Sequence, residues 1–412
     1  MADSVQGNRK LKIAICHPDL GIGGAERLIV DAAVELASHG HEVHVFTAHH
    51  DHGRCFEETV DGSFPVTVYG SFLPRHIFYR FHAICAYVRC IFVAICMVLL
   101  WPSFDIVLTD QVSAVIPVLK LKSSKVIFYC HFPDLLLAQH TTMLRRLYRM
   151  PIDMLEEAST GMADLILVNS KFTASVFAKT FKSLHAKGIN PNVLYPAVNV
   201  DQFGPPRAYL PKFLSINRFE RKKNIELAIL AFATVMSKEA SKGISEQIPD
   251  GEMDVSLVIA GGFDKRLKEN TEYLKELEDL AAKEGVSDKV FFIPSCSTEQ
   301  RDALLSECRC VLYTPKEEHF GIVPLEAMAA QKPVIACNSG GPLESIIHNT
   351  TGFLCEPTPQ NFSSAMLMLL NDPDMAKTMG LEAKIHVKKT FSRQVLGETL
   401  NRTIFNVVET NR

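Results

Sequence analysis

The chain has 412 residues, too many for one ordinary hydrophobic core, so its length predicts two or three domains. Hydrophobic residues make up 47% and charged residues 22% of the chain, which is typical of globular rather than disordered proteins. The net charge of −3 argues against a nucleic-acid partner, because such binding depends on an excess of basic side chains. The 11 cysteines are scattered without a Cys-x-x-Cys motif, which favours reduced thiols over a disulfide framework.

The first fifty residues predict a strand, a glycine loop, a helix and a second strand. Residues 12–16 and 42–47 are short apolar runs of the kind that form buried parallel strands. Gly23 and Gly24 open the helical pattern between them, without the third glycine of a dinucleotide-binding fingerprint. The loop therefore predicts a close backbone approach to a phosphate or a sugar, and a simple tight turn is the alternative.

Residues 49–52 contain three histidines and an aspartate, which by residue type resemble a metal cluster. Neighbouring side chains at a strand end point to opposite sides, and no recognised zinc spacing is present. A solvated loop is the better interpretation, and we expect no metal site.

Residues 84–101 are an apolar segment with one charge, Arg89, near the lower length limit for a membrane span. Apolar runs at 104–110, 125–130 and 163–170 predict further strands after it. A single crossing would put strands of one sheet on opposite sides of a bilayer. We therefore expect the segment to lie at a membrane surface, with a re-entrant segment or a core helix as alternatives.

The strand predicted at 125–130 is followed by His131. In parallel sheets ligands bind outside the carboxyl ends of the strands, so His131 is a candidate site residue. A structural histidine is the alternative interpretation.

The predicted strands and helices form two groups on either side of a proline-rich stretch at residues 191–211. We predict an α/β fold of two doubly wound Rossmann-like domains that face a central cleft. The expected boundaries are an N-terminal domain at 1–195, a linker at 196–212, a C-terminal domain at 213–385, and a C-terminal helix within 386–412 that packs back toward the first domain. The polar residues 237–254 predict a surface insertion.

Arg218 and Lys223 follow the first predicted strand of the second domain, at 213–217. An arginine and a lysine beyond a strand end are suited to a diphosphate, the first as a fork and the second as a point charge. The neighbouring Arg221 and Lys222 are interpreted as a solvated face.

Glu318 and Glu326 stand on either side of a glycine turn that leads into a helical pattern. The backbone amides of Phe320, Gly321 and Ile322 lie near that helix start, where they favour anions. The two glutamates could accept hydrogen bonds from sugar and ribose hydroxyls, although a solvated loop acid and a first-turn helix acid are the plain alternatives. Cations for a diphosphate and carboxylates for hydroxyls together predict a nucleotide-sugar site.

These motifs resemble the GT-B retaining glycosyltransferases of family 4, through residues 17–27, the Arg218…Lys223 pair and Glu318-x7-Glu326. Within that family, residues 129–137 and 146–164 are similar to the lipid-linked-oligosaccharide α-1,3/1,6-mannosyltransferases of the asparagine-glycosylation pathway. The resemblance implies GDP-mannose as donor, a dolichyl-diphosphate chitobiose-mannose acceptor, and no metal cofactor. It also implies the cytosolic face of the endoplasmic reticulum membrane, contact with the membrane surface, and other mannosyltransferases of the pathway as partners.

By position, the resemblance implies that Arg218 and Lys223 hold the donor diphosphate. It places Glu318 at the transferred sugar and Glu326 at the ribose, and has His131 contact the donor sugar or the acceptor. The candidate catalytic residues are thus Glu318, His131, Lys223 and Arg218, and the expected donor-binding residues also include Gly23, Gly24, Phe320, Gly321, Ile322 and Glu326.

One position departs from the family pattern: Asn224 follows Lys223 where many relatives carry glycine. The alternatives are another sugar-nucleotide enzyme, with a different donor or acceptor, and a non-catalytic GT-B scaffold.

Overall fold

The computed structural model describes residues 9–77, 81–123, 125–137, 143–237 and 255–409, and the predicted insertion lies almost wholly outside this part of the chain. The side chains of residues 144–146 also lie outside it. The chain forms two compact units, residues 1–197 together with 393–412, and residues 198–392.

The borders of the units differ from the predicted linker and C-terminal helix. Residues 198–212 of the predicted linker belong to the second unit, where Lys384 Nζ donates to the carbonyl of Phe203 (3.0 Å) and Tyr209 packs against the core. Within the range 386–412 expected for a C-terminal helix, the first residues are the end of α15 (Pro373–Thr390) in the second unit, and α16 (Arg393–Glu409) follows in the first unit.

The first unit is built on a seven-stranded parallel sheet of order β3-β2-β1-β4-β5-β6-β7. The strands are β1 (Lys12–Leu20), β2 (Glu42–His50), β3 (Val66–Val68), β4 (Ile106–Asp110), β5 (Val126–Cys130), β6 (Leu165–Val168) and β7 (Asn192–Val193). The order of its first six strands is that of a doubly wound dinucleotide-binding sheet, and it reverses between β1 and β4. Ligands bind at the carboxyl ends of the strands beside such a reversal.

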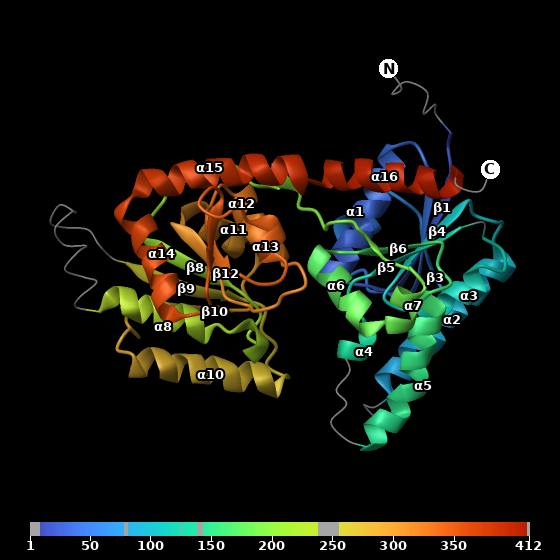
Figure 1. Cartoon of the computed structure of the whole chain (residues 1–412), viewed down its shortest axis with the longest axis horizontal. Coiled ribbons are helices and arrows are strands. Elements are labelled where there is room, and N and C mark those ends of the chain that lie inside the picture. Colours follow the sequence, from blue (N-terminus) through green and yellow to red (C-terminus); the bar gives the residue numbers. More distant parts are fainter. Residues whose placement is uncertain (1–8, 78–80, 124, 138–142, 238–254, 410–412) are drawn as a thin grey trace. The chain divides into compact units, whose positions relative to one another are not determined.

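Helices cover both faces of this sheet, as Figure 1 shows. They are α1 (Gly24–Ser38), α2 (His82–Leu100), α3 (Ile116–Leu119), α4 (Asp134–Leu137), α5 (Met143–Thr160), α6 (Lys171–Thr180), α7 (Lys182–Ala186) and α16, with short 3-10 turns at Glu57–Thr59 and Ser113–Val115. Alternate residues of β1 serve the two cores, because successive side chains of a strand face opposite sides. Ile13 and Ile15 join the core with α1 and α16, whereas Ala14 and Cys16 join the core with α2.

The apolar segment predicted to lie at a membrane surface forms α2, and one of its faces is a core face. Cys90, Val93 and Met97 are buried against the sheet, and Arg89 Nη2 lies 2.5 Å from Asp19 Oδ1 at the end of β1. The opposite face is exposed, and among the described residues α2 is the helix that is long and apolar enough to cross a membrane. The core-helix alternative therefore describes one face of α2, since 39% of its apolar 18-residue stretch is buried.

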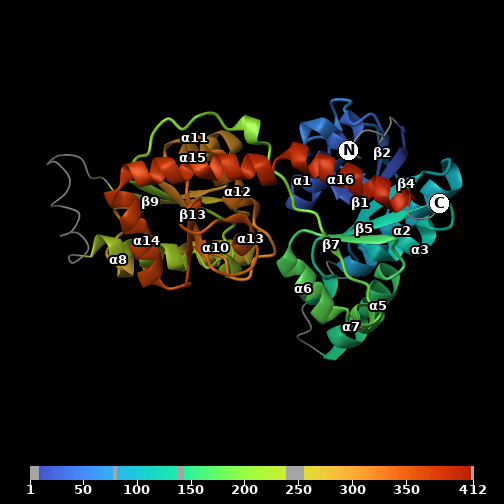
Figure 2. The same cartoon turned by 45° about the horizontal axis from the view of Figure 1, so that its top comes forward.

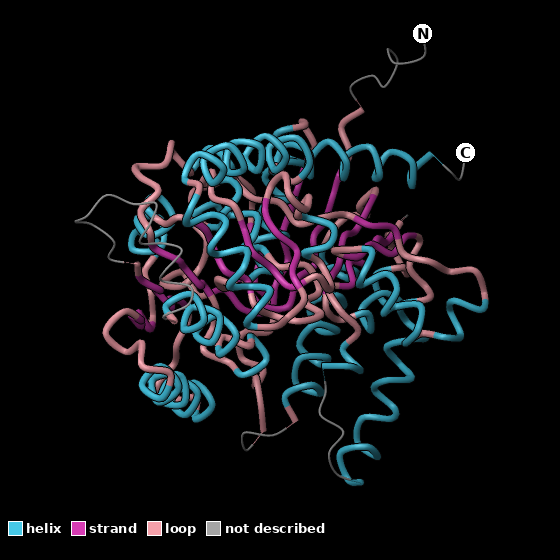
Figure 3. The backbone as a smooth tube through the Cα atoms, turned by 60° about the vertical axis from the view of Figure 1, so that its left-hand side comes forward, coloured by secondary structure: helices cyan, strands magenta, loops and turns pink. Residues whose placement is uncertain are grey.

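The second unit repeats the strand order of the first, with a parallel sheet of order β10-β9-β8-β11-β12-β13. The strands are β8 (Lys212–Ile216), β9 (Ser256–Gly261), β10 (Val290–Pro294), β11 (Cys310–Tyr313), β12 (Val334–Cys337) and β13 (Gly352–Cys355). Here the order reverses between β8 and β11. Figure 3 shows the strands in magenta and the helices in cyan.

The helices of the second unit are α8 (Glu226–Met236), α10 (Lys268–Lys283), α11 (Thr298–Glu307), α12 (Ile322–Ala329), α13 (Pro342–Ser345), α14 (Pro359–Asn371) and α15, with 3-10 turns η3 (Val200–Gln202) and η4 (Arg221–Lys223). The packing of α8 beside α14 can be followed in Figure 2. Apolar residues of both helices, such as Phe232 and Phe362, are fully buried in one core.

Arg89→Ala should destabilise the first unit, because it leaves Asp19 without its closest cation and removes a buried side chain. We expect a loss of about 2 kcal/mol, below the usual cost of breaking a buried pair because the Asp19 side chain is 39% exposed. Urea unfolding followed by fluorescence measures it, since the single tryptophan, Trp101, caps α2.

Arg75→Ala is the matched control. Arg75 Nη2 lies 3.9 Å from the same carboxylate, and its side chain is 53% exposed. Its loss should stay within about 0.5 kcal/mol, as for exposed ion pairs. Equal losses in the two variants would contradict the assignment of α2 as a helix anchored through Arg89.

Candidate active site

Two loops of the second unit meet where its strand order reverses. The loop after β8 carries Lys223, and the loop after β11 carries Glu318, whose Oε2 lies 2.5 Å from Lys223 Nζ. The side chains are 12% and 23% exposed. Thr314 Oγ1 donates to the carbonyl of Lys223 (2.8 Å) and ties the loops together at the backbone as well. The cation and the carboxylate that the sequence analysis assigned separately thus form one ion pair.

Asn224 occupies the conformation that a glycine in its place would favour. Its φ is 51°, in the left-handed region, where it ends the turn η4. Asparagine tolerates this region better than most residues. Its Nδ2 also donates to the carbonyl of Thr314 (3.3 Å), so the departure from the family pattern is accommodated.

The turn between Glu318 and α12 is held close to Tyr313. Gly321 caps α12 with a φ of 86°, and a Cβ there would lie 2.6 Å from Tyr313 Oη. Burial and then the adjacent Glu318, to which the phenol donates, raise the pKa of Tyr313 well above its usual range. Tyr313 therefore stays a hydrogen-bond donor to Glu318. This role was not predicted, because in the sequence Tyr313 is an ordinary residue of an apolar run.

Gly340 and Gly341 pack closely against the same turn. Gly341 N donates to the carbonyl of Glu318 (2.8 Å). A Cβ on Gly340 or Gly341 would lie 2.4 Å or less from backbone atoms of Glu318 or Phe320. These glycines were also missed. Their signal in the sequence is the Gly-Gly-Pro at 340–342, shortly after the apolar run at 333–337.

The other expected donor-site residues lie around this centre with partners of their own. Arg218 Nη1 is 3.0 Å from Glu220 Oε1, and its side chain is 61% exposed. Glu326, in α12, accepts from Arg301 Nη1 (2.9 Å); burial raises its pKa and Arg301 opposes the rise. Phe320 has a buried ring, and α12 begins at Ile322, so the amides of residues 320–322 do lie at a helix start. The ribose contact of Glu326 stays a prediction.

In the first unit the corresponding reversal holds a buried aspartate between two histidines. Asp110, the last residue of β4, contacts His17 Nδ1 through Oδ1 (2.7 Å) and His131 Nε2 through Oδ2 (2.8 Å). The side chains of His17 and Asp110 are fully buried, and that of His131 is 23% exposed. Of these three residues only His131 was predicted, because contacts between residues far apart in the chain leave no local pattern.

The charges of this cluster support one another. Burial alone would lower the pKa of His17, but the charge and hydrogen bond of Asp110 outweigh it, so the pKa is raised. Burial alone would raise the pKa of Asp110, but His17 and His131 outweigh it, so that pKa is lowered. His131 is the partly exposed member of the cluster, and its ring is oriented by the contact of Nε2 with the buried Asp110 carboxylate.

Gly23 and Gly24 stand at the start of α1, with Gly23 as N-cap and Gly24 as first helical residue. A Cβ on Gly23 would lie 2.1 Å from Glu26 Oε2, whereas a Cβ on Gly24 would meet nothing within 4 Å. A side chain at Gly23 would displace the Glu26 carboxylate, which ends a flexible side chain and can move aside. The open space at Gly24 fits the expected close approach of a ligand.

Within the described ranges, no group of three or more histidine, cysteine, aspartate or glutamate side chains could hold a metal ion. In the cluster at residues 49–52, His50 Nε2 hydrogen-bonds Thr59 Oγ1 (2.9 Å).

Comparison with known proteins places both halves of the chain. Residues 22–202 match the model of "Glycosyltransferase Family 4", and residues 204–386 match that of "Glycosyl transferases group 1". An α-1,3/1,6-mannosyltransferase ALG2 of Homo sapiens is 48% identical over 96% of each chain, and one of Dictyostelium discoideum is 45% identical over 97% of this chain and 99% of its own. The chain belongs to the ALG2 family of α-1,3/1,6-mannosyltransferases. It is therefore a glycosyltransferase, as the sequence analysis predicted.

Solved structures confirm the predicted GT-B class of this ALG2-family chain. Sucrose-phosphate synthase from Thermosynechococcus elongatus gives a TM-score of 0.75 at 20% identity, covering 98% of this chain and 100% of that one. The glycosyltransferase WaaG of lipopolysaccharide biosynthesis gives 0.65 at 17% identity, covering 95% and 99%. At such identities the likeness concerns the fold alone.

Asp110→Asn should destabilise this family member in a pH-dependent way. The lowered pKa of Asp110 adds stability above its usual value of 3.8, which is lost as pH falls through the folded value. The raised pKa of His17 adds stability below its usual value of 6.5, which is lost as pH rises through the folded value. Thermal unfolding between pH 4 and pH 9 should therefore show the largest loss between about pH 4 and 6.5, of about 3 kcal/mol.

Asp105→Asn, at the other end of β4, provides the control. Asp105 accepts a hydrogen bond from the backbone amide of Lys12 (2.8 Å), a group that does not titrate. The loss of stability in Asp105→Asn should therefore not change between pH 6 and 9. A loss at Asp110 that is equally flat over this range would contradict the charge coupling with His17.

Proposed function

We propose that the protein transfers mannose from GDP-mannose to a dolichyl-diphosphate chitobiose that carries one mannose, first with α-1,3 and then with α-1,6 linkage. The observation that carries the proposal is the Lys223–Glu318 pair at the strand reversal of the second unit, in a chain of the ALG2 family. The pair supports a sugar-nucleotide donor in particular. In such a donor the anionic diphosphate is bonded directly to the sugar. A cation can therefore contact the diphosphate while an adjacent carboxylate accepts a hydrogen bond from a sugar hydroxyl on the other side of the bond that breaks.

In this proposal Lys223 and Arg218 bind the diphosphate and offset the charge that develops on the departing GDP. Glu318 accepts a hydrogen bond from a hydroxyl of the transferred mannose. Glu326 accepts one from the ribose, and the amides of residues 320–322 contribute at the start of α12. Tyr313 keeps Glu318 oriented through the hydrogen bond described above.

In the first unit, His131 contacts the donor sugar or the acceptor, and the backbone at Gly23 and Gly24 approaches a phosphate or a sugar. Asp110 acts through His131, by fixing the imidazole with a hydrogen bond to Nε2. The acceptor hydroxyl oxygen bonds to the anomeric carbon as the bond to the diphosphate breaks, the hydroxyl proton passes to the departing diphosphate oxygen, and the product keeps the anomeric configuration. We assign no carboxylate nucleophile and no metal to this step.

The proposal is tested by mannose transfer with purified protein and a chitobiose-mannose lipid, in competition between GDP-mannose and UDP-sugars. We expect mannose from GDP-mannose in α-1,3 and α-1,6 linkage, determined by linkage analysis of the product. Transfer from a UDP-sugar instead would favour another sugar-nucleotide enzyme, and no transfer by folded protein would favour the scaffold alternative.

In the same assay Lys223→Ala and Glu318→Ala should each lower kcat/KM by about 100-fold or more, the usual effect of removing charge stabilisation from a transition state. Lys222→Ala is the matched control for Lys223, because its side chain is 66% exposed and pairs with Glu220 (3.0 Å). Transfer that survives in the Lys223 and Glu318 variants, or falls equally with Lys222→Ala, would overturn the site assignment.

We further infer that the protein lies on the cytosolic face of the endoplasmic reticulum membrane, near other mannosyltransferases of the pathway. The exposed face of α2 supports membrane contact, because it is an apolar stripe at helical spacing: Ile84, Val88, Ile95 and Leu99 are 41%, 50%, 40% and 72% exposed. Stripes of this kind mark interaction or membrane surfaces. Arg149, a basic residue beside α2, contributes nothing to lipid binding because it is 5% exposed and paired with Asp134 and Asp153.

Membrane binding predicts that the purified protein floats with liposomes that contain anionic lipid. Val88→Gln with Leu99→Gln should reduce the floating fraction, because both remove exposed apolar contacts and leave the core face of α2 intact. Leu381→Gln with Ile385→Gln, at positions 50% and 53% exposed on α15, is the control for a general loss of surface hydrophobicity. Protein that stays in the aqueous fraction in all three forms would contradict membrane attachment.

A further inference from the structure

A second apolar surface of the first unit lies near His131, at the carboxyl ends of the strands. The function proposed above does not use it. Along α5, Met143, Leu147, Met150 and Met154 follow a spacing of four, three and four residues, which puts them on one face of the helix. Their side chains are 89%, 68%, 56% and 67% exposed. Contiguous exposed apolar side chains of this kind mark a binding surface in a folded protein.

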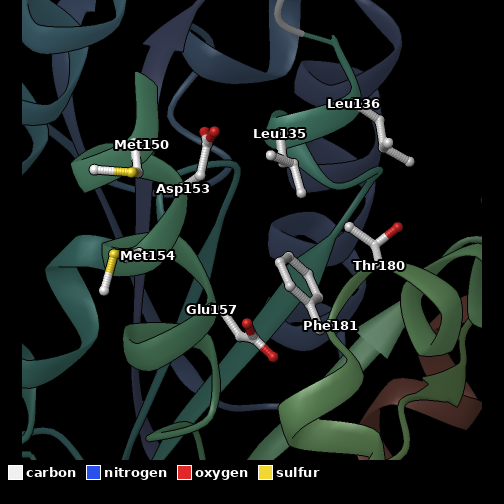
Figure 4. A pocket seen from close by; sticks show the side chains of 8 residues that line it. All are labelled: Leu135, Leu136, Met150, Asp153, Met154, Glu157, Thr180 and Phe181. Atoms are coloured by element: carbon white, nitrogen blue, oxygen red, sulfur yellow. The ribbon is translucent and has the colours of Figure 1, made fainter. Parts of the chain in front are cut away.

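Part of this surface is hollowed into an open groove of about 600 Å³. Figure 4 shows its lining, with Leu135 and Leu136 of α4 across from Met150 and Met154 of α5 and with Phe181 below. A volume of this size is within the range of small-molecule sites. Methionine side chains are flexible and polarizable, so they adapt to an irregular or branched apolar ligand.

The charged groups that line the groove already have partners in the protein. Asp153 Oδ1 lies 2.8 Å from Arg149 Nη2, and Glu157 Oε1 accepts from Ser183 N (2.9 Å) and Leu184 N (3.3 Å). An occupant therefore needs no charge or hydrogen-bonding group to satisfy them. This selects a hydrocarbon rather than a polar ligand.

The two walls of the groove are fixed to each other before any ligand binds. Glu156 of α5 accepts from the amides of Asp134 and Leu135 at the start of α4 (2.7 and 3.0 Å). Arg149 Nη2 of α5 lies 2.8 Å from Asp134 Oδ2. A preformed groove binds its ligand without the cost of ordering the walls.

The position of the groove connects it to the reaction. Leu135 is four residues beyond His131, so the groove starts within about 14 Å of the catalytic edge, the greatest distance that four residues can span. A lipid-linked acceptor has its hydrocarbon chain joined through the diphosphate to the glycan that reacts. Its first carbons must therefore lie a short distance from the site of transfer.

We propose that the groove between α4 and α5 binds the first isoprene units of the lipid-linked acceptor. This inference rests on the proposed function, because it takes the acceptor to be a polyisoprenyl diphosphate. The groove holds the chain, and the glycan extends from it toward His131. The hydrocarbon chain is then a recognised part of the substrate and not merely its membrane anchor.

The test compares two acceptors in detergent solution, with one glycan diphosphate on a long polyisoprenyl chain or on a ten-carbon chain. We expect the wild type to favour the long chain by about 10-fold in kcat/KM, as for other differences in apolar burial in a pocket. Met150→Gln with Met154→Gln keeps the side-chain length but adds polar groups to the groove. It should abolish this preference by raising the KM for the long acceptor, with the short acceptor and the KM for GDP-mannose unchanged.

Met143→Gln with Leu147→Gln is the matched control, on the same exposed face of α5 but outside the groove lining. It should keep the preference for the long chain. Equal losses in the two double variants would overturn the proposal in favour of contact with bilayer or detergent. An unchanged preference in the groove variant would overturn it outright.

A binding measurement separates this inference from the proposed function. The wild type should gain thermal stability with a sugar-free long-chain polyisoprenyl diphosphate and much less with inorganic diphosphate, and the groove variant should lose the difference. Binding without mannose transfer would leave the groove standing and overturn the function. Mannose transfer without binding or chain-length preference would do the reverse.

Discussion

The ion pair of Lys223 and Glu318 is the interaction on which the proposed donor site depends. It joins the loops that follow β8 and β11 at the position where the strand order of the second sheet reverses. At such a reversal the loops after the two neighbouring strands lead away in opposite directions, so their side chains would otherwise lie apart. The pair, together with Thr314 and Asn224, brings a cation and a carboxylate to one point, and Tyr313 and the glycines at 340–341 leave Glu318 little freedom to turn away.

In the first unit a different set of residues joins the loops and strand ends at the reversal of the strand order. Its sheet has the same strand order, and its reversal holds Asp110 between His17 and His131. A buried carboxylate needs compensating partners, because desolvation of an unpaired charge costs several kcal/mol. Without partners the pKa of the carboxyl group would rise instead. The two imidazoles provide that compensation, and His131 is in turn held in one orientation. In both units a buried or half-buried charge pair fixes the side chain that the proposed chemistry uses.

The sequence predicted the elements whose pattern is local. The apolar runs at 12–16, 104–110 and 125–130 contain strands, because buried parallel strands require largely apolar residues. It did not predict β3, β7 and β13, which are only two to four residues long, and the first two of these also carry an exposed position. The split of the chain end into α15 and α16 was missed as well, because the helical pattern runs on through both.

For the site, the sequence predicted the individual charged residues but not their pairing. Lys223 and Glu318 are 95 positions apart, and Arg301 and Glu326 are 25 apart, so their contacts follow from the sheet topology and not from a motif. The same holds for the apolar residues near His131. Leu135 and Met154 look like core residues in the sequence, and only the packing of α4 on α5 leaves them at an open groove. A motif identifies the residues proposed to bind the donor, whereas the groove proposed to bind the acceptor depends on how the helices between the motifs pack.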